Sequence, residues 1–229
     1  MPDQDAYSDI VARWRQVRAA IDRACAAAGR DPASVALLAV GKGHPAFASR
    51  RLLAAGQRSL GENRVQEAQS KWPELRAAFP DARFHLIGPL QTNKVRDAVA
   101  LADVIETLDR PRLAEALARE MDRTGRRLDC YIEVNIGAEP QKAGILPEAA
   151  GDFVADCRTR LALPVIGLMC IPPEAEDPRP HFRRLADLAA RHGLKHLSMG
   201  MTADFEAAIA AGSTEVRIGT AIFGPRPAT

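Results

Sequence analysis

The sequence predicts an α/β fold: a single (β/α)8 barrel of the TIM type, preceded by one extra helix. From residue 35 onward, short apolar runs of strand length alternate with amphipathic segments of helix length. Eight such pairs follow one another with short connections, as a parallel sheet requires. The chain has 229 residues and one barrel takes roughly 200–250, so we expect one domain over residues 1–229. An open parallel sheet is the alternative, but no GxGxxG opens its first helix.

The first predicted element is a helix over residues 7–28. Its apolar side chains recur at helical spacing: Ile10, Trp14, Val17, Ile21, Ala24 and Ala28. Gly29 and Pro32 follow the last of them and end the helix. Because this helix precedes the first strand, we expect it to flank the barrel.

The eight strands are predicted where short runs rich in β-branched and aliphatic residues end at turn residues. They cover residues 35–42, 59–63, 83–88, 104–108, 128–136, 165–171, 196–198 and 216–219. Helices are predicted between them at 45–55, 65–79, 92–100, 111–124, 147–161, 180–192 and 202–211, with a short turn at 220–223. Gly56, Gly193 and Gly212 end three of these helices, and Pro111 lies in the first turn of another.

The composition excludes several classes of function. The hydrophobic content of 47% is that of a globular protein with a sizeable core. The formal net charge is +2 and the charges are interspersed, which argues against a nucleic-acid-binding face. No segment has the apolar length needed to cross a membrane, and the polar, acidic first residues do not fit a signal peptide.

The four cysteines are scattered along the chain. They form no CxxC pair and no Cys/His cluster at metal-ligand spacing, so we expect no metal. Reduced, buried thiols are the ordinary state of such cysteines in the cytoplasm, where we expect the protein to reside.

Lys42 is the first candidate for chemistry. The chain has 31 Lys plus Arg, of which five are lysines, so it strongly prefers arginine where it needs a cation. Lys42 ends the apolar run of the first predicted strand. A desolvated lysine amine can lose its proton and attack a carbonyl, which a guanidinium cannot do. The alternative is a strand-end lysine that extends its ammonium group into water.

The carboxyl ends of the strands form the active face of a (β/α)8 barrel. Polar or small residues gather at these ends: Lys42, Glu62, Asn63, His85, Gln91, Asn135, Glu139, Lys142, Met169, Ser198, Arg217, Gly219 and Thr220. Such a rim suits a small ligand. If Lys42 points inward, alternation places Val40 and Leu38 on the same face, and likewise pairs Arg217 with Gly219. An inward arginine needs an anionic or accepting partner, and an internal salt bridge is its alternative role. Glu139 and Lys142 could form a rim pair that meets the ligand or a partner protein, but a solvated loop pair is the expectation.

Two turns suggest a phosphate cradle. Ser198-Met199-Gly200 follows the seventh strand, and Gly219-Thr220 follows the eighth. They offer hydroxyls and backbone N–H groups at the start of a helical turn, where barrels of this type often hold phosphate. A cradle opposite a strand-end lysine fits a phosphorylated aldehyde held as a Schiff base, with pyridoxal 5′-phosphate (PLP) the obvious choice.

Seven ordered blocks between residues 35 and 224 resemble a known family. They are Ala39-Val-Gly-Lys42, Gly61-Glu-Asn-Arg-Val-Gln-Glu67, His85-Leu-Ile-Gly-Pro-Leu-Gln-Thr-Asn-Lys94, Glu133-Val-Asn-Ile136, Gly167-Leu-Met169, Leu197-Ser-Met-Gly-Met201 and Val216-Arg-Ile-Gly-Thr-Ala-Ile-Phe-Gly224. In these blocks the chain is similar to the pyridoxal phosphate homeostasis proteins, whose fold resembles the barrel domain of bacterial alanine racemase. The resemblance covers nearly the whole chain.

The resemblance implies roles for several residues. It implies Lys42 as the Schiff-base lysine, Arg217 facing the pyridine nitrogen, and Asn63 and Met169 lining the cofactor. It also implies that Ser198, Gly219 and Thr220, with the backbone of Met199 and Gly200, surround the phosphate. The family usually has serine before the lysine, then threonine and a second lysine. Here the run is Gly41-Lys42-Gly43-His44, so the second lysine is missing.

Two hypotheses from different classes follow. The first is a PLP-binding protein of intracellular PLP homeostasis, without efficient catalysis, that serves apo PLP-dependent enzymes as transient clients. The second is a PLP-dependent amino-acid racemase of weak activity. A two-base racemase needs a second proton-transfer group opposite the lysine. In the resembling racemase this is a tyrosine from a second, all-β domain and a partner subunit.

The sequence favours the first hypothesis. Its two tyrosines, Tyr7 and Tyr131, are predicted in the leading helix and early in the fifth strand. No second domain is expected, so we predict a monomer. His44 or His85 could act as a makeshift base, but each is expected to be a structural or loop histidine. A third hypothesis is a barrel lyase that forms a Schiff base with a sugar phosphate aldehyde.

Overall fold

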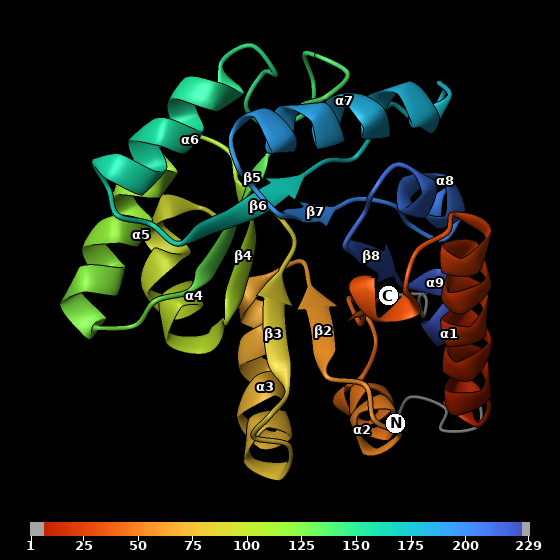
Figure 1. The fold of residues 1–229 in the computed structure, drawn as a ribbon. Coiled ribbons are helices and arrows are strands. Elements are labelled where there is room, and N and C mark those ends of the chain that lie inside the picture. Colours follow the sequence, from red (N-terminus) through yellow and green to blue (C-terminus); the bar gives the residue numbers. More distant parts are fainter. Residues whose placement is uncertain (1–6, 226–229) are drawn as a thin grey trace.

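The computed structural model describes residues 7–225, which form a closed barrel of eight parallel strands wrapped by helices (Figure 1). The strands pair in chain order, and the eighth returns to the first. They are β1 (Ala36–Val40), β2 (Ser59–Glu62), β3 (Arg83–Leu86), β4 (Val104–Leu108), β5 (Asp129–Glu133), β6 (Val165–Met169), β7 (His196–Ser198) and β8 (Glu215–Ile218). The predicted barrel is confirmed, and the open sheet is excluded.

Helices connect the strands and form the outer layer. They are α2 (Ala46–Ala54), α3 (Val65–Ala78), α4 (Val95–Leu101), α5 (Pro111–Thr124), α6 (Ala150–Thr159), α7 (Pro178–Arg191) and α8 (Phe205–Ala210), with α9 (Thr220–Phe223) after β8. Short 3-10 helices cover Pro32–Ser34 and Thr92–Lys94. None of the helices in the described part of the chain is long and apolar enough to cross a membrane.

Strand alternation separates two packing regions. Leu37 and Ala39 of β1 point outward and belong to the large apolar core between the barrel and its helices. Leu38 pairs with Arg217 of β8, and Val40 lines a cavity at the end of the barrel. The predicted alternation on β1 is therefore correct.

The helix that precedes the barrel is α1 (Ile10–Ala27), which packs outside it against α2, α8 and α9 (Figure 1). Its buried face includes Ile10 and Ile21. Arg13 Nε donates to the carbonyl of Ile222 in α9 at 2.7 Å, and Trp14 Nε1 donates to Gln57 Oε1 at 2.9 Å. The helix thus covers the sector where the last strand meets the first.

Several boundaries differ from the prediction, and three of them shape the carboxyl end of the barrel. β5 ends at Glu133 rather than 136, and Val134 makes only an isolated bridge to Ile145. α7 begins at Pro178 rather than 180, because the Asp177 carboxylate accepts a hydrogen bond from the N–H of Arg179 and caps it. α8 begins at Phe205 rather than 202. There the Asp204 carboxylate accepts from the N–H of Met201 at 2.6 Å and closes a turn.

Candidate functional site

The carboxyl ends of the strands surround a cavity of about 550 Å³, which we call the mouth cavity. A cavity of this size holds a small organic ligand. Its wall consists of Val40, Lys42, Asn63, Ile87, Gly88, Pro89, Thr107, Glu133, Val134, Asn135, Lys142, Ala143, Ile171, Met201, Thr202, Ala203, Arg217, Gly219 and Thr220. Seven residues of the polar rim expected from the sequence lie on this wall, and six do not: Glu62, His85, Gln91, Glu139, Met169 and Ser198.

Five of the nine predicted cofactor-binding residues lie on this wall: Lys42, Asn63, Arg217, Gly219 and Thr220. Lys42 follows β1 and Asn63 follows β2, whereas the other three end or follow β8. The closed barrel brings them together because β8 lies beside β1 and β1 beside β2. Their roles toward a cofactor stay predictions.

The turn at Ser198, Met199 and Gly200 lies behind the wall. Ser198 is fully buried, and its hydroxyl donates to Glu106 Oε2 at 2.7 Å inside the barrel. The N–H of Met199 donates to the carbonyl of Glu215 at 3.1 Å. These two donors already serve the protein, whereas the phosphate contacts predicted for this turn stay predictions.

The wall at this position is instead formed by the next residues, Met201, Thr202 and Ala203. Met169, the fourth predicted residue that is absent from the wall, packs inside the barrel with Val104 and Tyr131. A shift of a few residues along a strand–helix loop is not visible in the sequence, because it depends on where the turn closes.

Arg217 has a fixed orientation. Its Nη1 donates to the carbonyl and the hydroxyl of Ser198 at 2.7 and 2.8 Å, and its Nη2 donates to the carbonyl of Cys170 at 2.9 Å. It is buried yet lines the mouth cavity. The guanidinium therefore presents a permanent, pre-oriented positive charge to a ligand. Among residues 7–225 its hydrogen-bond partners are carbonyl and hydroxyl oxygens, and the direct internal salt bridge considered as its alternative role is not formed there.

The β1–α2 loop is held in place by an ion-pair cluster. Lys71 Nζ donates to Glu62 Oε1 at 3.0 Å, to Glu67 Oε1 at 2.7 Å and to the carbonyl of Gly41 at 3.2 Å. The same Glu67 oxygen accepts from the N–H of Gly43 at 2.6 Å. Burial raises the pKa of Glu62 to about 7, against the opposing charge of Lys71. The backbone is thereby fixed at Gly41 and Gly43, on both sides of Lys42.

The backbone of Asn63 is held in place because it packs closely against the backbone of Gly88. A Cβ on Gly88 would lie 2.2 Å from the carbonyl oxygen of Asn63, so only glycine fits at this position. The Thr107 hydroxyl donates to the carbonyl of Gly88 at 2.8 Å and fixes the other side. The ends of β2, β3 and β4 are thus locked together at the cavity.

Glu133 is a site residue that the sequence reasoning missed. It lies at the end of β5 on the cavity wall, and burial raises its pKa to about 7, with the charge of Asp109 adding to the rise and that of Arg217 opposing it. Such a carboxyl can accept or donate a proton near neutral pH. The available signal was a carboxylate inside an otherwise apolar strand.

Lys142 brings a second amine to the cavity. It forms an ion pair with Glu139 and donates to the carbonyl of Pro172 at 3.1 Å. Asn135 organises the loop between them, since its amide donates to the carbonyls of Glu139 and Lys142. The pair expected to be solvated is therefore partly buried, and its lysine lines the cavity.

The two histidines considered as makeshift bases have structural contacts. The Tyr7 hydroxyl hydrogen-bonds to His44 Nδ1 at 2.9 Å, and the His44 ring stacks on Phe223. His85 Nδ1 lies 2.8 Å from Glu106 Oε1 inside the barrel. Neither residue lies on the wall of the mouth cavity.

Known proteins match nearly the whole chain. The model of the family described as "Alanine racemase, N-terminal domain" matches residues 13–227. A pyridoxal phosphate homeostasis protein of Pseudomonas aeruginosa is 42% identical over 224 residues, which cover 96% of each chain. Among solved structures, PipY of Synechococcus elongatus with PLP bound superposes with a TM-score of 0.81 at 36% identity, over 94% of this chain and 100% of that one.

The alanine racemase of Clostridium difficile has a TM-score of 0.65 at 14% identity, over 85% of this chain and 52% of the racemase. This likeness concerns the fold alone, whereas the likeness to the homeostasis proteins extends to sequence over the full length. The chain belongs to the alanine racemase N-terminal domain family and, within it, to the pyridoxal phosphate homeostasis proteins.

Proposed function

We propose that this protein binds PLP in the mouth cavity, through a Schiff base with Lys42, and takes part in PLP homeostasis. One observation carries the proposal: the amine of Lys42 shares a cavity with the Arg217 guanidinium and with the hydroxyl and backbone N–H groups of Gly219 and Thr220. An anionic aromatic aldehyde needs these groups. The names of the relatives and the PLP bound to PipY support it.

The donor set fits the parts of this cofactor. Thr220 begins α9, where the first N–H groups have no partner within the helix and suit a phosphate. Arg217 would donate to the ring nitrogen and keep it unprotonated. Asn63 would line the ring. When bound, PLP supplies an aldehyde for an amine and a ring that accepts electrons.

The contacts of Met169, Ser198, Met199 and Gly200 with the cofactor remain predictions. In our proposal Ser198 acts through Arg217. Its hydroxyl accepts a hydrogen bond from the Arg217 guanidinium and so orients it.

Absorbance of the purified protein tests the proposal. The wild type is expected to carry a visible Schiff-base band, which Lys42→Ala abolishes. Lys142→Ala is the matched control, because Lys142 lies in the same cavity but is engaged by Glu139 and Pro172. Borohydride reduction followed by peptide mass analysis should place the modification on Lys42. A band that survives Lys42→Ala and disappears in Lys142→Ala would refute the assignment.

We propose that the protein holds PLP without efficient turnover. The described tyrosines lie away from the mouth cavity: Tyr7 contacts His44, and Tyr131 is buried with Met169. Weak racemase activity is the second candidate, and Glu133 favours it as a carboxyl able to exchange a proton near neutral pH.

Exchange of the alanine α-proton with solvent deuterium separates these two candidates. We expect a rate no higher than that of free PLP, in the wild type and in Glu133→Gln alike. Enzymatic exchange that falls by roughly 100-fold or more in Glu133→Gln would favour the racemase, with Glu133 as its base.

We further propose that the protein is a cytoplasmic monomer that passes PLP to apo enzymes. The four cysteines are free and buried, which suits a reducing compartment.

Among the described residues, the large apolar side chains that are exposed are Leu146, Ile171 and Met201, and the last two flank the mouth cavity. Light scattering should give the monomer mass. Activation of an apo PLP enzyme by the loaded protein, faster than by spontaneous release, tests delivery.

A further inference from the structure

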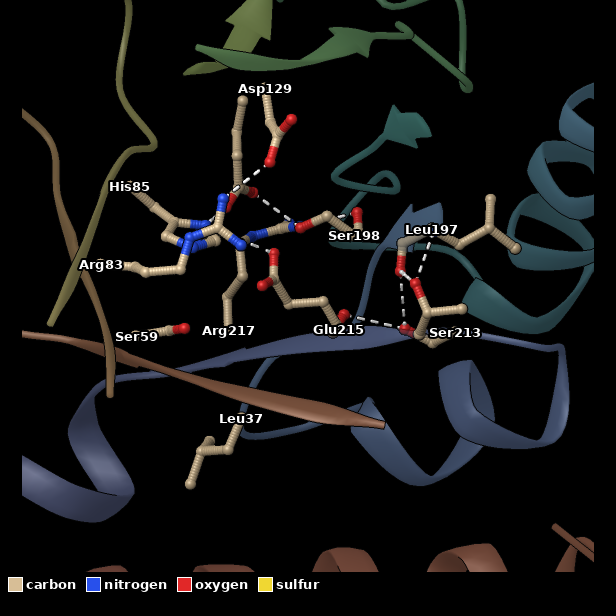
Figure 2. A network of polar contacts seen from close by, with 12 residues as sticks. Leu37, Ser59, Arg83, His85, Asp129, Leu197, Ser198, Ser213, Glu215 and Arg217 are labelled. Atoms are coloured by element: carbon tan, nitrogen blue, oxygen red, sulfur yellow. Dashed lines mark hydrogen bonds and ion pairs between the residues drawn. The ribbon is translucent and has the colours of Figure 1, made fainter. Parts of the chain in front are cut away.

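Three titratable side chains meet inside the barrel, and none of them lines the mouth cavity; Figure 2 labels two of them, His85 and Glu215. His85 of β3, Glu106 of β4 and Glu215 of β8 form this group, which we call the basal cluster. His85 Nδ1 lies 2.8 Å from Glu106 Oε1 and 3.7 Å from Glu215 Oε1. One potential ligand atom from each residue lies within 4.8 Å of the others, and all three residues are buried.

The cluster contains buried atoms without a hydrogen-bond partner. Glu215 Oε1 and His85 Nε2 are both inaccessible to solvent and accept or donate no hydrogen bond within residues 7–225. Glu215 is only 5% exposed, and Oε1 points toward the other two residues, with His85 Nδ1 as its neighbour at 3.7 Å. A buried carboxylate oxygen without a partner is costly, so its position indicates a missing cation or proton.

Access to the cluster is available from the amino-terminal face of the barrel. A second cavity of about 380 Å³ opens there, and its lining includes His85, Glu215 and Tyr131. Arg83 and Asp129 form an ion pair at its rim (Figure 2). An ion with its water can therefore reach the cluster without passing the mouth cavity.

We propose that the basal cluster binds one divalent transition-metal ion of the zinc and cobalt class, through His85 Nδ1, one oxygen each of Glu106 and Glu215, and water from the second cavity. Zinc bound at about 2.0–2.2 Å in a tetrahedron holds its ligand atoms about 3.3–3.6 Å apart. The separations of 2.8 and 3.7 Å bracket this range, so small side-chain rotations suffice. Imidazole nitrogen and carboxylate oxygen are both ligands that zinc accepts.

The donor set also selects the class of metal. Magnesium and calcium prefer ligand sets made of oxygen alone, whereas imidazole suits zinc, cobalt and nickel. Two carboxylates balance the charge of the ion. A ligand atom that carries a proton must lose it to solvent before it can bind the ion. Binding should therefore release protons and weaken as the pH falls.

The proposed site is linked to the cavity that we assign to PLP. Glu106 Oε2 accepts from the Ser198 hydroxyl at 2.7 Å, and the same hydroxyl accepts from Arg217 Nη1 at 2.8 Å. A metal on Glu106 would change the partner that orients Ser198 and, through it, Arg217. This link is a consequence of the site, and the metal proposal stands without PLP binding.

Titration of the full-length protein with Co²⁺ and Zn²⁺ tests the proposal. The protein is first treated with a chelator, and Co²⁺ binding is followed by its ligand-field absorbance and Zn²⁺ binding by calorimetry. We expect one equivalent of each metal, release of protons in buffers of different ionisation enthalpy, and at least a tenfold loss of affinity in Glu215→Gln. His85→Gln serves as the second variant if Glu215→Gln does not fold, as judged by circular dichroism.

A surface pair supplies the control. His181 Nε2 lies 2.7 Å from Glu176 Oε2 on the outside of the protein, where adventitious metal would bind. The double variant His181→Gln with Glu176→Gln should keep the full affinity. Absence of stoichiometric binding in the wild type would overturn the proposal and leave a shared proton in the cluster. Equal affinity in the wild type and the cluster variants, or thiolate charge-transfer bands with Co²⁺, would overturn it as well.

Discussion

Glu62 is a buried carboxyl whose charge changes near neutral pH. It is 2% exposed, and burial raises its pKa from 4.5 to about 7 although Lys71 lies 3.0 Å away. Between these two values the folded chain keeps a proton that the unfolded chain has released. The contribution of Glu62 to stability is therefore fully present below about pH 4.5 and is lost as the pH rises through 7.

Glu62→Gln should remove this pH dependence, since an amide does not titrate. Between about pH 5 and about pH 8, the free energy of unfolding of the wild type should fall by roughly 1–3 kcal/mol more than that of the variant. Urea unfolding at several pH values measures both. Parallel pH profiles for the two proteins would show that Glu62 is not the titrating group.

At the scale of elements, α3 acts as a support for the β1–α2 loop. Lys71 projects from α3 and bonds to the carbonyl of Gly41, while Glu67 of the same helix accepts from the N–H of Gly43. The side chain of Lys71 is 8% exposed, so water does not screen its ion pairs. A loop with two glycines would otherwise be flexible; here its backbone is fixed on both sides of Lys42.

Lys71→Met should destabilise the protein by about 2–4 kcal/mol, because it leaves a buried carboxyl and a carbonyl without their donor. It should also weaken the retention of PLP, since the loop that carries Lys42 loses its support. Arg50→Met is the control: Arg50 pairs with Glu74 between α2 and α3, but both side chains are largely exposed. That variant should change stability by no more than about 1 kcal/mol. Chemical unfolding and cofactor release rates measure both effects, and equal behaviour of the two variants would contradict this role of α3.

At the scale of the whole molecule, α1 and the barrel are expected to unfold together. α1 buries Ile10 and Ile21 against the outer layer, and Arg30, just beyond its end, donates to the carbonyls of Ile209 and Ser213 at 2.8 and 2.7 Å. Contacts of this kind join the leading helix to α8 and β8. The helix is therefore an integral part of the fold.

The two tryptophans of the chain allow this cooperativity to be measured. Trp14 lies in α1, and Trp72 is buried in α3, where it stacks on Phe84. In Trp72→Phe the remaining fluorescence reports α1, and in Trp14→Phe it reports the barrel. In each variant the fluorescence transition in urea should coincide with loss of far-ultraviolet circular dichroism. An earlier fluorescence transition in Trp72→Phe would mean that α1 detaches first.

The sequence predicted most elements within a few residues. The strand His196–Ser198 and the short turn Thr220–Phe223 match to the residue, as do two consecutive elements, Val104–Leu108 and Pro111–Thr124. Hydrophobic periodicity and a proline in the first helical turn mark these two clearly. The starts of α7 and α8 were missed because the side chains of Asp177 and Asp204 close local turns there. Such hydrogen bonds depend on side-chain conformation, which periodicity does not record.

Local patterning was sufficient for the barrel and the order of its elements, because strand alternation and turn chemistry act over a few neighbouring positions. The family followed from the resemblance of seven sequence blocks, and five of the nine predicted cofactor-binding residues lie on the wall of the mouth cavity. Local patterning could not predict that Glu133 lines that cavity, that Ser198 lies behind its wall, or that the three residues of the basal cluster meet. His85 and Glu106 are 21 positions apart, and Ser198 is 92 positions from Glu106. These residues meet because the barrel closes and because the strand register aligns them. Their burial at that contact then determines which of the side chains carry a charge.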